Sequence, residues 1–187
     1  FVPARPRSGM GHVTLYIATS VDGYLADEDG GVDWLDQYGS ESEGSEATGG
    51  FSEFLESVDC LVMGATTYQQ VLGFGEWPYG ETPTYVFTHR ELSPATEAVE
   101  FVDRDVAAVA GELERKHDHV WLVGGAQLAQ SFLRAREIDH LRLFLAPILL
   151  GDGIRLFDGD YDRQRLRLLD TASDDSGIVE QRYEFLD

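Results

Sequence analysis

Short apolar runs of strand length alternate with helix-like stretches along this chain, and that alternation constrains its fold more than any other feature. We predict strands at 12–18, 58–63, 84–88, 99–102, 119–123 and 140–146. Between them we predict helices at 51–57, at 66–72, after a capping Asp103, and at 126–133. Largely apolar strands separated by helices are typical of a mainly parallel sheet that carries helices on both faces.

The end of the chain breaks this alternation, because two strands are predicted there with no helix between them, at 166–172 and 178–186. Consecutive strands with a short connection pair in antiparallel fashion. We therefore predict one three-layer α/β domain over residues 10–187, with a mainly parallel central sheet and an antiparallel C-terminal edge. Residues 1–9 show no periodic pattern and are expected to be a tag or a disordered leader. The small, polar and acidic stretch 40–50 is predicted to be a mobile loop.

The chain is strongly acidic, with 34 Asp and Glu against 14 Lys and Arg residues and a net charge of −20. Such a charge repels nucleic acids and anionic membrane surfaces, so neither is an expected partner. No apolar run approaches the about 20 residues of a membrane helix. There is no basic start followed by an apolar core, and Cys60 is the single cysteine. These features are typical of a cytoplasmic protein.

The excess of acids also indicates adaptation to a cytoplasm rich in salt, because the Debye length falls to about 3 Å at molar salt and carboxylate repulsion is then screened. We therefore expect the midpoint of thermal unfolding to rise steeply with KCl up to molar concentration, as followed by circular dichroism. A midpoint that does not respond to salt would contradict this halophilic adaptation.

Two predicted strands pass directly into helices through small residues, in VMGATTY at 62–68 and LVGGAQL at 122–128. Ligands of parallel sheets bind beyond the carboxyl ends of the strands. The N-terminus of a helix offers free N–H groups and a positive dipole end there, and glycine lets the backbone approach a phosphate closely. The two junctions together could hold both phosphates of a dinucleotide, or each could be an ordinary strand–helix turn.

Polar residues follow two other predicted strands. In FTHREL, the segment Thr88–Arg90 combines a hydroxyl, an imidazole and a guanidinium, which could bind a phosphomonoester or form a surface turn. In DWL, Asp33 beside Trp34 could face a heterocyclic substrate or cap a helix. Pro147 in APILLGDG marks the end of its strand. The histidines are not joined by acids or cysteine at ligand spacing, so no metal is expected.

In this order the segments ATSVDGYLA, VDCLVMGATTY, YVFTHREL, VWLVGGAQLAQSFLRAREIDHLRL and LAPILLGDGIRLF resemble the dihydrofolate reductase-like superfamily. The chain is similar, from about residue 12 to 186, to the reductase (C-terminal) domain of the bifunctional deaminase–reductase of riboflavin biosynthesis. The resemblance implies a dihydrofolate reductase-like fold, NADPH as the hydride donor with NADH as an alternative, and a homodimer.

The resemblance also implies a set of site residues. Along the nicotinamide would lie Ala18, Val21, Gly23 and Leu25. The pyrophosphate would be held by Gly64, Thr66, Thr67, Gly124, Gly125, Ala126, Gln127 and Leu128. The adenosine 2′-phosphate would be held by Thr88, His89 and Arg90. The substrate would contact Trp34, Phe54, Pro147, Leu150 and Gly151. The candidates for the proton-donating catalytic acid are Asp33 and Glu53.

Two positions depart from the relatives that the chain resembles. Dihydrofolate reductases place a basic residue after the glycine of MG, where this chain has Ala65, and riboflavin-pathway reductases often place a glutamate before the double glycine, where it has Val123. The expected activity is hydride transfer to a small heterocycle of the pterin or riboflavin-pathway pyrimidine type. The alternative is a non-catalytic nucleotide-binding protein that retains the dinucleotide cradle.

Overall fold

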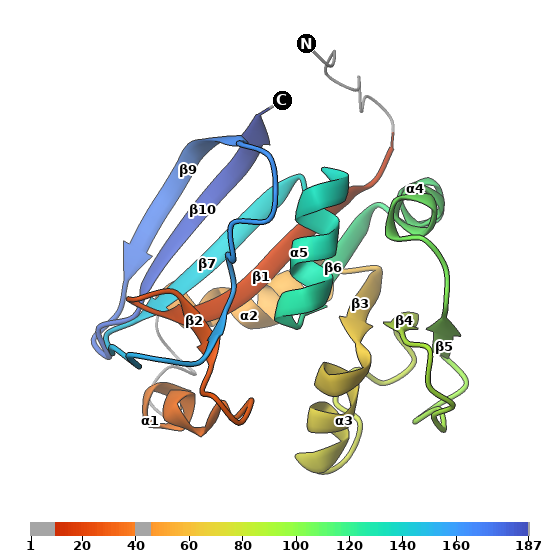
Figure 1. The fold of residues 1–187 in the computed structure, drawn as a ribbon, viewed down its shortest axis with the longest axis horizontal. Coiled ribbons are helices and arrows are strands. Elements are labelled where there is room, and N and C mark those ends of the chain that lie inside the picture. The colour runs from red at the N-terminus through yellow and green to blue at the C-terminus, as the bar shows by residue number, and fades with distance from the viewer. Residues whose placement is uncertain (1–9, 40–45, 187) are drawn as a thin grey trace.

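A computed structural model describes residues 10–39 and 46–186, and its centre is an eight-stranded sheet (Figure 1). The strands of this sheet are β1 (His12–Ser20), β3 (Cys60–Gly64), β4 (Thr84–Phe87), β5 (Val99–Val102), β6 (His119–Gly124), β7 (His140–Ala146), β9 (Arg165–Ser173) and β10 (Val179–Leu186). They lie in the order β5-β4-β3-β6-β1-β7-β10-β9. The first six in this order pair in parallel, and β10 pairs antiparallel with both β7 and β9. The predicted α/β fold with an antiparallel C-terminal edge is confirmed.

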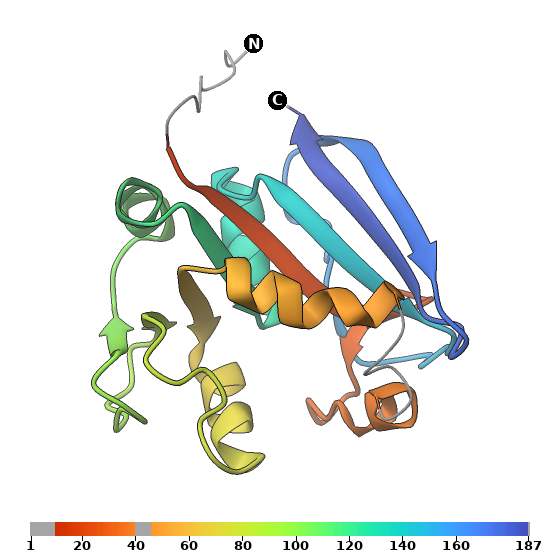
Figure 2. The same ribbon diagram turned by 180° about the vertical axis from the view of Figure 1, so that it is seen from behind.

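Helices cover both faces of the sheet. On one face lie α4 (Val106–Lys116) and α5 (Ala126–Ala135), and α2 (Glu46–Ser57) crosses the other face (Figures 1 and 2). At the carboxyl end of β3 stands α3 (Ala65–Gly73). Four short elements complete the fold: β2 (Tyr24–Ala26), the 3-10 helix η1 (Asp33–Leu35), α1 (Asp36–Gly39) and β8 (Ile154–Arg155), with β2 and β8 paired in a small second sheet.

Alternation along the strands divides the core between the two faces. Leu15 pairs with Leu122 in register, and both are fully buried in the cluster that also holds buried residues of α4 and α5. The next residue along β1, Tyr16, points to the α2 face, where its ring stacks on Phe54 at 4.5 Å. Successive strand side chains alternate between faces, so each buried strand contributes to both layers.

Both predictions that place a particular aspartate at a helix cap are wrong. The N-cap of α4 is Asp105, whose carboxylate accepts a hydrogen bond from the Ala108 amide at 3.1 Å. Asp103 lies too near the end of β5 to be the N-cap of α4, because the chain needs two further residues to turn from the strand into the helix. The first residue of η1 is Asp33, and Val32 is at its cap position without a side-chain hydrogen bond.

The loop predicted at 40–50 is wrong for the residues of this stretch that the structure describes. Residues 46–50 belong to α2, while 40–45 lie outside the described residues, as do the predicted leader 1–9 and residue 187. Glycine weakens a helix, but Gly50 allows a close approach here. A Cβ at this position would come within 3.1 Å of the Arg142 Nη2 atom. The packing of α2 on the sheet therefore overrides the local preference.

A charged cluster centred on a buried glutamate lies between α2 and the sheet. Glu180 on β10 is 0% exposed and accepts a hydrogen bond from Arg142 Nε at 2.6 Å. Arg182 binds the same carboxylate through Nε at 2.8 Å and Nη2 at 3.0 Å. The Arg142 guanidinium carbon also lies 4.9 Å from the centre of the Tyr16 ring. The cluster joins β7, β10 and β1 beneath α2.

Candidate functional site

A cavity of about 720 Å³ opens where β3, β4, β5 and β6 end. It is lined by many of the residues predicted to bind the cofactor: Leu25, Gly64, Thr66, Thr67, Thr88, His89, Arg90, Gly125, Ala126, Gln127 and Leu128. The cavity is not lined by Ala18, Val21, Gly23 or Gly124. Gly124 is, however, directly followed by Gly125, which does line it. Segments far apart in the sequence thus meet at one edge of the sheet, because parallel strands end there together.

Two helix N-termini lie side by side in this cavity. The residues at their caps are Gly64 before α3 and Gly125 before α5, and neither helix has a side-chain cap or an acid in its first turn. The junctions adjoin, since a Cβ on Gly64 would lie 3.8 Å from the Gly125 nitrogen. First-turn amides without a side-chain partner, together with two positive dipole ends, favour an anion such as a phosphate.

The double glycine is tightly placed. Gly124 has φ +123°, a conformation that other residues rarely adopt, and a Cβ there would lie 3.4 Å from Ile17 Cδ1. A Cβ on Gly125 would lie 3.2 Å from the Thr67 hydroxyl oxygen. The peptide bond between the two glycines is cis. Backbone rather than side chains therefore forms the wall between the two helices.

The far end of the cavity lies beyond β4 and β5. The Thr88 amide donates to the Val102 carbonyl at 2.9 Å, and the Thr88 hydroxyl accepts from the Arg90 amide at 2.9 Å. The Nδ1 atom of His89 contacts the carboxylate of Asp103, which also lines the cavity. Asp103 was overlooked as a site residue, because the sequence assigned it to a helix cap. Its position directly after a parallel strand was the available signal.

A hydrogen-bonded aspartate fixes the loop that follows β1. The Asp22 carboxylate accepts hydrogen bonds from the Ser20 hydroxyl at 2.6 Å and from the amides of Leu150 and Gly151 at 3.1 and 2.8 Å. These bonds, the Ser20 bond foremost, lower the pKa of Asp22 to about 2. The loop 20–26 is therefore tied to the segment after β7. Asp22 belongs to the segment 20–25 that the resemblance places along the nicotinamide, but the sequence did not single it out.

The structure does not gather the predicted substrate and catalytic residues around the cofactor cavity. Asp33 is exposed at the start of η1, and Glu53 is exposed on α2 beside a different pocket. Phe54 is only 4% exposed and packs in the core beneath α2. Trp34 is half-buried near α1, whereas Leu150 and Gly151 lie beside Asp22 and Pro147 lies beside Gly177. Their roles stay predictions.

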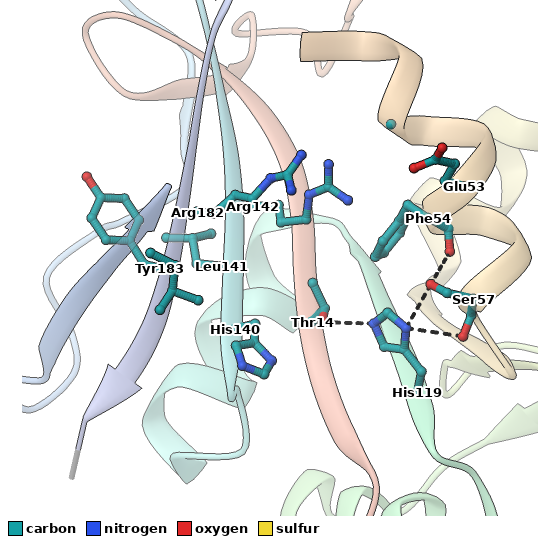
Figure 3. A pocket seen from close by; sticks show the side chains of 12 residues that line it. Thr14, Glu53, Phe54, Ser57, His119, His140, Leu141, Arg142, Arg182 and Tyr183 are labelled. Atoms are coloured by element: carbon teal, nitrogen blue, oxygen red, sulfur yellow. Dashed lines mark hydrogen bonds between the residues drawn. The ribbon is translucent and has the colours of Figure 1, made fainter. Parts of the chain in front are cut away.

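The second pocket, of about 320 Å³, lies between α2 and the amino ends of β1, β6 and β7 (Figure 3). His119 Nε2 lies 2.9 Å from the Thr14 hydroxyl, and its Nδ1 lies 3.2 Å from the Ser57 carbonyl. A neutral ring with its proton on Nδ1 satisfies both contacts. Burial, with a smaller contribution from the nearby His12, lowers the pKa of His119 to about 4. This histidine therefore fastens the end of α2 to the sheet.

The protonation of His119 makes the stability of the folded protein depend on pH. Its pKa in the folded protein, about 4, lies below its ordinary 6.5, so the unfolded chain binds a proton that the folded chain does not. The contribution of His119 to the free energy of unfolding is fully present above pH 6.5 and is lost as the pH falls towards 4. Because the ring is partly exposed, we expect a loss of about 1–2 kcal/mol. Urea unfolding at pH 7 and pH 5 measures it, and His119→Gln should reduce the loss. An equal loss in the variant would contradict this origin.

Metal-binding groups and membrane-spanning helices are both absent from the described ranges 10–39 and 46–186. No three histidine, cysteine, aspartate or glutamate side chains within them form a group that could hold a metal ion. No helix within them is both long enough and apolar enough to span a membrane.

The chain is similar to known proteins of one family. The RibD C-terminal domain family matches residues 11–180. The uncharacterised protein YwjB of Bacillus subtilis is 37% identical over 159 residues, covering 84% of this chain and 88% of its own. The riboflavin biosynthesis protein RibD of Mycobacterium tuberculosis is 26% identical over 161 residues, 82% of this chain and 47% of its own.

A solved structure carries the same fold. A protein assigned to riboflavin biosynthesis in Shewanella sp. PV-4 superposes with a TM-score of 0.83 at 28% identity, over 94% of this chain and 99% of its own. The family match spans most of the sequence, including both glycine junctions and the segment Thr88–Arg90. The chain therefore belongs to the RibD C-terminal domain family, whose fold is dihydrofolate reductase-like.

Proposed function

We propose that this protein is a reductase that uses NADPH, or NADH in its place, to reduce a small heterocycle of the pterin or riboflavin-pathway pyrimidine type. The observation that carries the proposal is the pair of glycine-capped helix N-termini meeting in one cavity. Membership of a family that includes riboflavin-pathway reductase domains supports the same activity.

The residues of the cavity fit a dinucleotide in three parts. The backbone amides at the starts of α3 and α5 would bind the pyrophosphate. Thr88 and Arg90 lie at the β4–β5 end, where the adenosine ribose would lie. Ile17, Leu25 and Val123 form an apolar wall at the β1–β6 end, where the nicotinamide would lie. The volume of about 720 Å³ is in the usual range for a cofactor site.

The cofactor, when bound, supplies the hydride. The protein would hold the ring and the substrate in contact and exclude water between them. Asp22 contributes by holding the loop 20–26 against the segment after β7, which keeps the β1 end of the cavity in shape. A proton must also reach the product. Since neither Asp33 nor Glu53 lines the cofactor cavity, ordered water is the other source that we consider.

Isothermal titration of the protein with NADPH in molar KCl tests the proposal. We expect saturable binding, followed by oxidation of the nicotinamide when a suitable dihydropterin or pyrimidinone is added. Binding without oxidation across such a panel would favour the non-catalytic nucleotide-binding alternative. An absence of binding at millimolar cofactor would reject both functions.

We also propose that the protein acts as a cytoplasmic homodimer. The edge strand β9 exposes Leu166, Leu168 and Leu169 by 40%, 54% and 52%, and exposed apolar side chains on an edge strand favour association. Light scattering in molar KCl should give twice the mass of the chain, and the mass of a single chain would contradict the dimer.

A further inference from the structure

The charged residues that line the cofactor cavity gather at one end. They are Arg90 after β4, and Asp103 and Arg104 after β5, with His89 beside them. This is the end where the proposed function places the adenosine ribose. The 2′ position of that ribose carries a phosphate in NADPH and a hydroxyl in NADH, so charge at this end distinguishes the two cofactors.

Most of the positive charge at this end is already engaged. The Arg104 guanidinium binds both oxygens of Glu112, at 3.0 and 2.5 Å. The Nδ1 atom of His89 contacts the Asp103 carboxylate. Within the described part of the chain, the Arg90 guanidinium has no charged partner. Two carboxylates, those of Asp103 and Glu112, therefore lie among the cationic groups at this end, which leaves little net positive charge for a phosphate dianion.

We infer that Asp103 sets the choice between NADPH and NADH by placing a carboxylate at the β4–β5 end of the cavity. A carboxylate accepts a hydrogen bond from a ribose hydroxyl and repels a phosphate. The same carboxylate holds the His89 imidazole, which would otherwise be available to a phosphate. Asp103 is free for this role because Asp105 caps α4. The inference rests on the proposed function, since it requires a dinucleotide in this cavity.

The side chain of Asp103 is 62% exposed, so a substitution there leaves the core intact. Asp103→Asn keeps the shape of the side chain and removes its negative charge. The matched control is Glu100→Gln, which removes one negative charge from an exposed position on β5, the strand that precedes Asp103, and outside the cavity. The two variants share their change in net charge and differ in its location.

Titration calorimetry with NADPH and with NADH, at one fixed KCl concentration, gives the ratio of the two dissociation constants. In the wild type the two constants should differ by about tenfold or less, because one unengaged guanidinium is opposed by one carboxylate. Asp103→Asn should strengthen NADPH binding about fivefold or more and change NADH binding by less than about twofold. Glu100→Gln should leave the ratio as in the wild type.

The outcomes separate the inference from the proposed function. If both dinucleotides bind and the ratio is the same in the wild type and Asp103→Asn, the inference is wrong and the proposed function stands. An equal change of the ratio in Glu100→Gln would also overturn it, because net charge rather than position would then be the cause. If neither dinucleotide binds the wild type, the proposed function fails and the inference fails with it.

Discussion

Gly64→Ala is expected to weaken NADPH binding by about tenfold to a hundredfold, the equivalent of losing one hydrogen bond to a charged group. Gly64 ends β3 and lines the cavity between the starts of α3 and α5. A methyl group there would lie 3.8 Å from the Gly125 nitrogen, in the space through which a phosphate would approach the amides.

This substitution should not harm the fold. Gly64 has φ −81° and ψ 163°, which alanine adopts readily, and every neighbouring atom is at ordinary contact distance. Stability should be unchanged or raised by up to about 1 kcal/mol. Gly73→Ala is the control, because Gly73 ends the same helix and a Cβ there would meet nothing within 4 Å. If Gly64→Ala binds NADPH as the wild type does, the backbone of this junction does not hold the pyrophosphate.

Glu180→Gln is expected to lower the free energy of unfolding by about 3 kcal/mol, because it leaves two guanidinium groups beneath α2 without their anion. The Glu180 side chain is 1% exposed and that of Arg142 only 14%, so water cannot replace the lost carboxylate. The Arg142 Nη2 atom depends on it most. This atom is buried 2.6 Å from Glu180 Oε1, at an angle that makes no hydrogen bond, and has no hydrogen-bond partner within the described residues.

Glu184→Gln on the same strand is the matched control. Glu184 pairs with Arg167 near the surface, where the side chains are 33% and 61% exposed. Breaking an exposed pair costs less than about 1 kcal/mol. Urea unfolding of both variants at one KCl concentration measures the difference. Similar small losses in the two variants would show that the buried cluster contributes no more than a surface ion pair.

The pattern of apolar runs was sufficient to predict the parallel sheet and its antiparallel edge. A strand buried on both faces must be largely apolar. The apolar runs VDCLVM and HVWLVG therefore indicate buried strands without any information about the residues that pack against them. The two glycine junctions could be found for a similar local reason. A turn from strand to helix with φ +123° at Gly124 requires glycine, and its neighbours in sequence show where the helix begins.

The boundaries of the helices and the contacts between charged side chains could not be predicted from the sequence in this way. The stretch 46–50 is polar and rich in glycine, yet it is helical because α2 packs on the sheet through Phe54 and Tyr16. The resemblance implied a substrate contact for Phe54, and that role stays a prediction. Only the packed structure showed Phe54 stacked against β1.

The sequence by itself determined the layered α/β fold and the two glycine junctions between strand and helix, because burial and backbone conformation act on residues that are neighbours along the chain. Only the tertiary structure decided which side chains meet at the ends of the strands. His89 and Asp103 are separated by a strand and a loop, and they pair because β4 and β5 lie side by side. An ion pair depends on distance in space, and that distance is fixed only when the sheet has formed.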